Sequence, residues 1–256
     1  MGRRQAPVFG VVALLTLVAS CTALADEQLV KLIERIKPAV VGVGTYAATR
    51  SPAAHLLGSG FAVGDGRVVA TNFHVIDRKL DDAHRERLVI FIGHGTQVEY
   101  RAAVPAGIDR HHDLALLEIA GAALPALALE AAAAIREGDD IAFTGFPIGA
   151  VLGLQAVTHH GIVSALTPLA LPAANARQLT PEKIAGLRDP FQIIQLDATA
   201  YPGNSGSPVF SRDSGQVVGI INRVFVKGKK EDVLRDPSNI TYAVPVRYLR
   251  ELLEQR

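Results

Sequence analysis

The stretch Tyr201-Pro-Gly-Asn-Ser-Gly-Ser-Pro-Val209 reads as a reactive serine held on a tight glycine turn. Gly203 permits backbone conformations that a β-carbon would resist. Its amide and the amide of Ser205 can then point at one spot, which is what stabilisation of an oxyanion requires. Taken alone, the stretch predicts only a glycine-rich turn, so its chemistry depends on what the rest of the chain supplies.

Two other fragments supply the missing groups. An apolar run ends in His74, and Asp113 opens another apolar run. A serine hydroxyl is a poor nucleophile at neutral pH unless a base lies within hydrogen-bond reach and a third group fixes the tautomer of that base. We therefore predict Ser205 as nucleophile, His74 as base and Asp113 as the group that orients the base. Asp109 is a nearby alternative, but the Asp-Leu-Ala-Leu-Leu context favours Asp113.

Six short sequence motifs resemble the chymotrypsin-like (trypsin-like) serine proteases, and within them the HtrA/Deg-type bacterial proteases. The motifs are Gly58-Ser-Gly-Phe61, Thr71-Asn-Phe-His-Val75, Asp113-Leu-Ala-Leu-Leu117, Gly161-Ile-Val-Ser-Ala-Leu166, Gly203-Asn-Ser-Gly206 and Ile240-Thr-Tyr-Ala-Val-Pro245. The resemblance implies a serine endopeptidase that cleaves unfolded or exposed protein segments through an acyl-enzyme. HtrA-like proteins usually carry a C-terminal PDZ domain, and we expect this sequence to lack one.

Strand-like segments fall into two sets. The first set is 39–46, 60–63, 67–73, 88–92, 97–105 and 113–119, and the second is 140–146, 154–165, 191–198, 208–210, 217–225 and 239–244. Short strands with frequent turn residues favour closed barrels. The sequence predicts an all-β protein with two six-stranded antiparallel barrels and short helices over 26–37 and 245–254. Within a protease domain at 26–256, we expect a first barrel at 38–120, a linker at 121–138, and a second barrel with the C-terminal helix at 139–256.

The N-terminal segment is typical of export. Arg3 and Arg4 precede an apolar run, and Ala23-Leu-Ala25 fits a signal-peptidase site, so residues 1–25 are predicted to be a signal peptide. Val18-Ala-Ser-Cys21 also fits a lipobox, in which the cysteine becomes lipidated. Both readings predict an exported protein, either periplasmic or secreted, with a lipid anchor at Cys21 in the second case.

Composition limits the other classes of function. The formal net charge is +1, so nothing favours nucleic acid or an anionic membrane surface as a partner. Cys21 is the only cysteine, which excludes thiol catalysis and thiolate metal sites. Neighbouring residues on a strand face opposite ways, so the pairs His111-His112 and His159-His160 do not predict a metal site. We expect no cofactor and no metal, with a protein or peptide substrate as partner. The resemblance also leaves a homo-oligomer open.

The resemblance implies a specificity pocket with its floor near Thr199, and with Ile220, Ile221 and Asn222 as wall and substrate-pairing strand. None of the four is acidic, so a preference for arginine or lysine lacks an electrostatic partner. A small or medium aliphatic side chain is expected there, or an acidic one if Arg223 turns inward. The loop 167–190 is a candidate regulatory switch.

The sequence leaves two alternatives to an active protease open. One is a protease-fold chaperone or binding protein with a misaligned, inactive triad. The other is an esterase, but the nucleophile elbow of esterases requires a Gly-x-Ser-x-Gly motif and the order Ser, Asp, His. Here Ser207 stands where the final glycine would be, and the order is His74, Asp113, Ser205.

Overall fold

The computed structural model describes residues 27–94, 97–131, 135–147, 154–169, 190–222 and 240–256. Residues 1–35 form one unit and residues 36–256 another. Residues 27–36 are helical, close to the predicted 26–37, whereas the predicted signal peptide at 1–25 lies outside the described residues. Within the described part of the chain, no helix has both the length and the apolar character that crossing a membrane requires.

The first barrel contains six strands and three short helical segments. Its strands are β1 (Val40–Tyr46), β2 (Ala54–Val63), β3 (Val68–Asn72), β4 (Arg87–His94), β5 (Gln97–Asp109) and β6 (Leu114–Ile119), and its helical segments are η1 (Lys37–Ala39), α2 (Phe73–Ile76) and η2 (Asp82–His84). The strands close in the order β1-β2-β3-β6-β5-β4, with antiparallel pairing throughout. The turn Gly64-Asp-Gly66 joins β2 to β3, with positive φ at both glycines.

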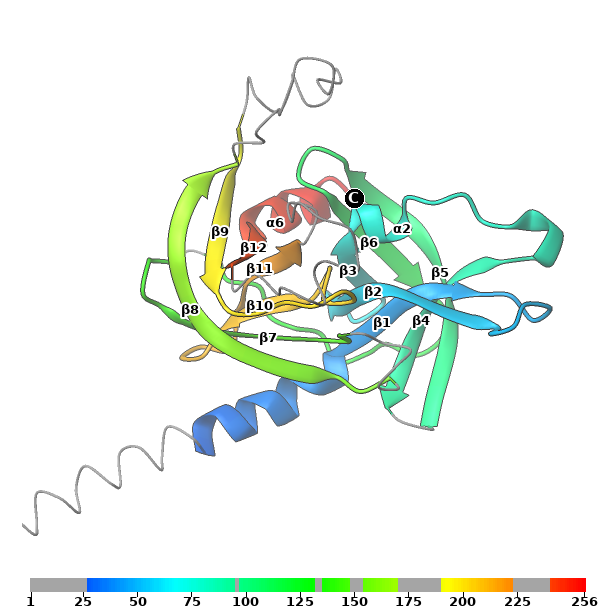
Figure 1. Cartoon of the computed structure of the whole chain (residues 1–256), viewed down its shortest axis with the longest axis horizontal. Helices are drawn as coiled ribbons and strands as arrows, with labels where there is room; N and C mark the ends of the chain where they lie inside the picture. Colours follow the sequence, from blue (N-terminus) through cyan, green and yellow to red (C-terminus); the bar gives the residue numbers. More distant parts are fainter. Residues whose placement is uncertain (1–26, 95–96, 132–134, 148–153, 170–189, 223–239) are drawn as a thin grey trace, which may run out of the picture. The chain divides into compact units, whose positions relative to one another are not determined.

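The second barrel repeats this strand order. Its strands are β7 (Asp140–Gly145), β8 (Val157–Pro168), β9 (Gln192–Asp197), β10 (Pro208–Ser211), β11 (Val217–Asn222) and β12 (Ile240–Pro245), and α6 (Val246–Glu254) follows. They close in the order β7-β8-β9-β12-β11-β10 (Figure 1), again with antiparallel pairing. The prediction of two six-stranded antiparallel barrels is therefore confirmed.

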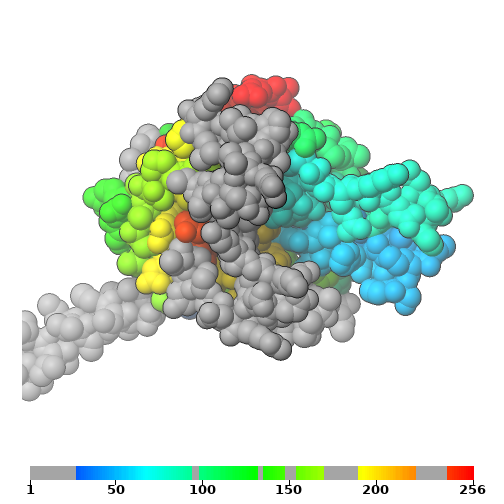
Figure 2. Space-filling model, turned by 45° about the horizontal axis from the view of Figure 1, so that its top comes forward, coloured from blue at the N-terminus to red at the C-terminus, as the bar shows by residue number. Residues whose placement is uncertain are grey.

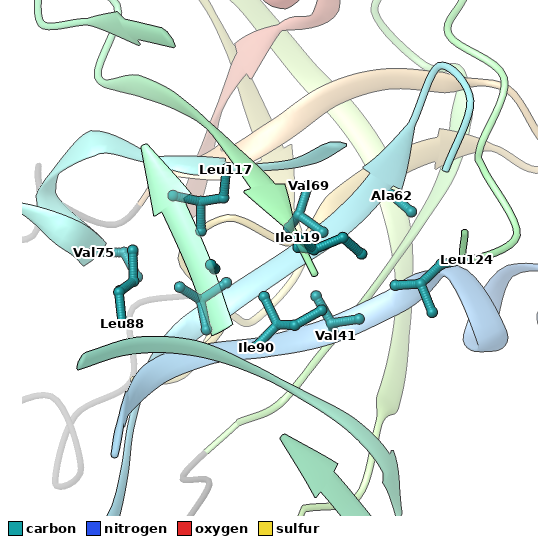
Figure 3. Packing of buried hydrophobic residues seen from close by; sticks show 11 residues of the cluster. Val41, Ala62, Val69, Val75, Leu88, Ile90, Leu117, Ile119 and Leu124 are labelled. Atoms are coloured by element: carbon teal, nitrogen blue, oxygen red, sulfur yellow. The ribbon is translucent and has the colours of Figure 1, made fainter. Parts of the chain in front are cut away.

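Each barrel has its own apolar core. In the first, side chains from all six strands meet inside the barrel, and Val75 of α2 joins them (Figure 3). In the second, Ile141, Phe143, Leu196 and Ile221 belong to a separate cluster. The inward-facing apolar residues bury their surface against one another, so each barrel is a rigid support for the loops at its rim.

The segment between the barrels is bonded to both. Leu124 is buried in the first core, and the Leu127 amide donates to the Ala62 carbonyl of β2 over 2.9 Å. The Glu130 amide donates to the Val217 carbonyl of β11, also over 2.9 Å. The described part of the predicted linker, residues 121–131 and 135–138, contains no helix.

Helix α6 buries Val246, Leu249 and Leu252, while Tyr248 stacks on His112 at 3.8 Å between ring centroids. His112 lies in the β5–β6 turn of the first barrel, so the C-terminal helix packs beside that turn. Figure 2 shows residues of the first barrel in blue to cyan and of the second in yellow-green to yellow on opposite sides of one face, with the C-terminal residues in red above them.

Several strand boundaries differ from the predicted ones. Strand β2 begins at Ala54 rather than residue 60, because residues 54–56 pair with β1 beyond a bulge at Val43/Gly44. Strand β5 continues past Pro105, because a register shift there accommodates a residue that has no N–H to donate. Phe73 opens α2 instead of ending a strand.

Candidate active site

His74 is placed by an abrupt change from strand to helix. Strand β3 is buried along its whole length and ends at Asn72, whose backbone is extended with φ −82° and ψ 149°. The four residues of α2 follow at once, so the chain turns out of the barrel wall. Val75 remains in the core, while the His74 side chain is 33% exposed.

Asp113 lies in the turn just before β6, with a positive φ of 55°. Aspartate tolerates this left-handed conformation better than most residues, at a small cost in free energy. Its carbonyl accepts hydrogen bonds from the Phe73 amide at 3.0 Å and from Asn72 Nδ2 at 3.1 Å. The end of β3 thus holds the backbone of Asp113 in this conformation.

The carboxylate of Asp113 binds His74 at two points. Oδ2 lies 2.6 Å from the ring atom Nδ1, and Oδ1 accepts the His74 backbone amide at 2.8 Å. A carboxylate that faces Nδ1 favours the tautomer with the proton on Nδ1, and in the neutral imidazole Nε2 then has the lone pair. This tautomer is the one in which a histidine acts as a general base.

Two other histidine–aspartate pairs differ from the His74–Asp113 pair, because they are local in the sequence. His112 Nδ1 lies 2.6 Å from Asp109 Oδ2, and His84 Nδ1 lies 2.7 Å from Asp81 Oδ2. Both are local pairs three residues apart in the sequence. Asp109, the alternative orienting residue, thus bonds to His112. Burial raises the pKa of Asp109, but the hydrogen bonds from His112 outweigh this and leave the pKa below its usual value.

Ser205 lies between two tight turns. The Asn204 amide donates to the Tyr201 carbonyl at 3.0 Å, and Gly203 has φ 99°. Proline at the second position and a positive-φ glycine at the third are the signature of a type II turn. The Ser207 amide donates to the Asn204 carbonyl at 3.0 Å in the following turn.

The amides of Gly203 and Ser205 make no hydrogen bond within the described residues. Their neighbours are all engaged: the Gly206 amide donates to the Ile221 carbonyl at 2.9 Å, and the Ile221 amide donates to the Ser207 carbonyl at 2.9 Å. Strand β11 therefore fixes the exit of the turn, while the two amides predicted to form an oxyanion hole have no acceptor.

Strand β11 also connects the serine turn to the aspartate. Asn222, the residue after Ile221, donates from Nδ2 to Asp113 Oδ2 at 2.9 Å. A β-carbon on Gly58 would contact both Val75 Cγ2, at 2.8 Å, and the Ser205 carbonyl, at 2.9 Å. The residue after His74 and the backbone of Ser205 therefore flank the same glycine. Within the described residues, no hydrogen bond joins Ser205 Oγ to the His74 ring.

Asn222 has a position that the sequence alone did not reveal. It was predicted as part of the substrate-pairing strand, yet its side chain lies on Asp113, and it is 1% exposed. Ile220 and Ile221 are fully buried, and Thr199 is half-buried after β9. Arg223 and most of the predicted switch loop lie outside the described residues, as does the chain that follows Asn222 up to residue 239.

Two antiparallel barrels with a histidine, an aspartate and a serine where they meet define the class of chymotrypsin-like serine proteases. Residues 58–220 match the trypsin-like peptidase domain family, and the chain belongs to that family.

The curated relatives are HtrA proteases. Serine protease HTRA1A of Danio rerio is 29% identical over 229 residues, which is 88% of this chain and 40% of that protein. A probable periplasmic serine endoprotease DegP-like of Ectopseudomonas mendocina is 28% identical over 206 residues, 80% of this chain and 36% of that protein. The chain thus spans about two fifths of the length of these relatives.

Solved structures agree with the fold. The HtrA-type protease AlgW with tripeptide has a TM-score of 0.63 at 24% identity, covering 88% of this chain and 62% of that one. The serine endoprotease from Yersinia pestis has a TM-score of 0.60 at 24% identity, covering 89% of this chain and 65% of that one.

Proposed function

We propose that this protein is a serine endopeptidase in which Ser205, His74 and Asp113 act together. The observation that supports this best is the two-point binding of the Asp113 carboxylate to His74, which orients the ring and favours the tautomer in which Nε2 can accept a proton. Membership of the trypsin-like peptidase family gives the reaction type.

The chemistry follows from these positions. Ser205 Oγ attacks the carbonyl carbon of a peptide bond as its proton passes to His74 Nε2, and the carbonyl oxygen becomes an oxyanion. The free amides of Gly203 and Ser205 donate to that oxyanion. His74 then gives its proton to the leaving amine, and the acyl-enzyme remains. Water attacks the acyl-enzyme with the same base, which releases the acid and restores Ser205.

A missing contact between Ser205 Oγ and His74 is compatible with this mechanism. Catalytic hydrogen bonds in the absence of substrate are often long or poorly aligned and tighten when substrate binds. Asp113 already holds His74 through both the ring atom Nδ1 and the backbone amide, so only the serine side has to adjust.

The substrate is proposed to be an extended, unfolded or exposed protein segment that pairs with the chain after β11. None of Thr199, Ile220, Ile221 and Asn222 is acidic, which supports a residue other than arginine or lysine at the cleavage site. The periplasmic designation of DegP-like relatives supports a place in the cell envelope, reached through the predicted signal peptide or the lipobox ending at Cys21.

The test joins a chemical probe to substrate profiling. A fluorophosphonate should label wild type on Ser205 and leave Ser205→Ala unlabelled, because only an activated serine reacts readily. Mass spectrometry of a denatured protein should show new termini after small or medium aliphatic residues, with Ser205→Ala slower by at least about a thousandfold. Absence of both labelling and cleavage in correctly folded wild type would favour the chaperone alternative.

A further inference from the structure

Ser59 lies in the barrel opposite to the nucleophile, on β2, and is fully buried. Its backbone and side chain nevertheless bond to the serine turn of the second barrel. The Ser59 amide donates to the Ser205 carbonyl at 2.8 Å. Its hydroxyl donates to the Gly203 carbonyl at 2.7 Å. Ser59 therefore binds the carbonyls of Gly203 and Ser205, the same two residues whose amides have no acceptor within the described residues.

The single proton of the Ser59 hydroxyl is committed to Gly203. While the hydroxyl donates to Gly203, it accepts from the Phe146 amide, just after β7, at 2.9 Å. The Ser59 carbonyl in turn accepts from Thr71 Oγ1 at 2.7 Å. A hydroxyl carries a single proton, and the Phe146 amide can only donate, so the proton of Ser59 must point at Gly203.

Fixing the Gly203 carbonyl fixes the orientation of the peptide that follows Gly203. Glycine has no β-carbon to restrict it, and many other backbone conformations are open to it. At the observed φ of 99°, the Gly203 amide remains without an acceptor in the described structure. Without the Ser59 hydroxyl, the peptide after Gly203 would be held only by the bond from the Asn204 amide to the Tyr201 carbonyl. The φ and ψ of Gly203 link its own amide to that peptide, so the amide would be less well preorganised as an oxyanion donor.

We propose that Ser59 is a positioning residue, which presets the oxyanion hole through the Gly203 carbonyl. This inference rests on the proposed peptidase function. It assigns a catalytic consequence to a side chain that touches neither the substrate nor the triad.

The test compares Ser59→Ala with Ser59→Thr, which keeps the hydroxyl, and with Thr71→Val. The Thr71 hydroxyl bonds to the Ser59 carbonyl, so Thr71→Val removes an equally buried hydrogen bond from the same strand pair without touching Gly203. Active-site titration and thermal unfolding give the folded fraction of each variant. Turnover on one peptide substrate is then expressed per folded site.

Ser59→Ala is expected to lower kcat per folded site by about 10–100-fold with KM within about twofold, because the lost donors act on the transition state. Its affinity for a peptide aldehyde, which forms a tetrahedral oxyanion with the serine, should fall by a similar factor. Thr71→Val should leave kcat per folded site and the affinity for the aldehyde unchanged. Ser59→Thr should lower both much less than Ser59→Ala does. If Ser59→Ala does not fold, Ser59→Cys, a weaker donor of similar size, should show an intermediate kcat.

The possible results separate two kinds of failure. An active wild type whose kcat per folded site is unchanged in Ser59→Ala, or equally reduced in Thr71→Val, would overturn the positioning role and leave the protease intact. A folded wild type that neither cleaves peptides nor binds the aldehyde would instead overturn the proposed function, and this inference with it.

Discussion

Asn222 donates its side-chain amide to the Asp113 carboxylate over 2.9 Å, and this bond joins β11 of the second barrel to the turn before β6 of the first. The carboxylate thus has donors on two sides: the imidazole and amide of His74, and Asn222. An aspartate held in this way cannot rotate away from the histidine without losing a charge-assisted hydrogen bond.

Replacing Asn222 by leucine keeps the approximate size of the side chain, removes the donor and adds no charge beside Asp113. We expect kcat to fall by about 10–100-fold, the effect of losing one hydrogen bond to a charged group. The measurement is steady-state kinetics on one peptide. A rise in KM with unchanged kcat would instead assign the Asn222 side chain to substrate binding.

Asp113→Asn should be more severe. The amide would face His74 with a donor and force the wrong tautomer on the ring, so kcat should fall by about 10⁴-fold. Circular dichroism and thermal unfolding should show an intact fold. Asp109→Asn is the matched control, because Asp109 bonds to His112 and not to His74. Equal losses in the two variants would mean that Asp113 has no special role.

Gly206→Ala tests how tightly the serine turn fits against β2. At φ 87°, its β-carbon would lie 2.1 Å from the Ser59 carbonyl oxygen. Gly138 has φ 89° but nothing within 4 Å of the same position. Gly138→Ala should therefore lower the free energy of unfolding by only about 1 kcal/mol, the cost of placing alanine at a positive φ. Gly206→Ala should lower it by several kcal/mol more, because of the clash with Ser59. Urea unfolding measures both, and similar costs would mean that the turn has room to move.

The buried Glu86 side chain predicts how the stability of the fold changes at acidic pH. Hydrogen bonds from Thr45, the Asp81 amide and Arg50, with the nearby charge of Arg78, lower the pKa of Glu86 from 4.5 to about 2. The folded state thus favours the ionised carboxylate, so its stabilisation is complete above about pH 4.5 and is lost as the pH falls towards 2.

Glu86→Gln should lower the free energy of unfolding at pH 7 by about 1–3 kcal/mol and flatten its decline between pH 5 and pH 2. Urea unfolding at several pH values measures this, with the exposed Glu251→Gln on α6 as control. An unchanged slope in Glu86→Gln would show that other groups govern acid unfolding.

Burial lowers the pKa of His159, which stacks on Phe143 at 4.9 Å and whose buried Nε2 has no hydrogen-bond partner among the residues that the structure describes. The unfolded chain therefore binds a proton more readily, and stability should fall as the pH drops below about 6.5. His159→Phe should weaken this fall and leave stability at pH 8 equal or higher. The exposed His160→Asn is the control, and a persistent slope in His159→Phe would contradict the assignment.

Strand periodicity and turn chemistry were enough to predict the number of strands and their division into two sets. The boundaries were less predictable where a bulge let a strand continue past Pro105, or where residues 54–56 paired with β1 beyond another bulge. Pairing partners and bulges depend on contacts between distant segments, which local patterns do not encode.

Within the site, motif context selected Asp113 over Asp109, although both bind a histidine in the structure. The role of Asn222 was missed because an asparagine at the end of an apolar strand has no sequence signal for its partner. Ser59 was quoted only as part of a motif, and its bond to Gly203 spans 144 positions of the chain. Such contacts follow from how the two barrels pack together.

The same long-range contacts bear on when the protein becomes active during its biosynthesis. His74, Asp113 and Ser59 all precede the second barrel, yet their partners Asn222, Ser205 and Gly203 occur late in the chain. Because chains emerge from the ribosome N-terminus first, a nascent molecule holds its base long before it holds a nucleophile. Under the proposed function, hydrolytic competence therefore arrives only after the second barrel has been synthesised.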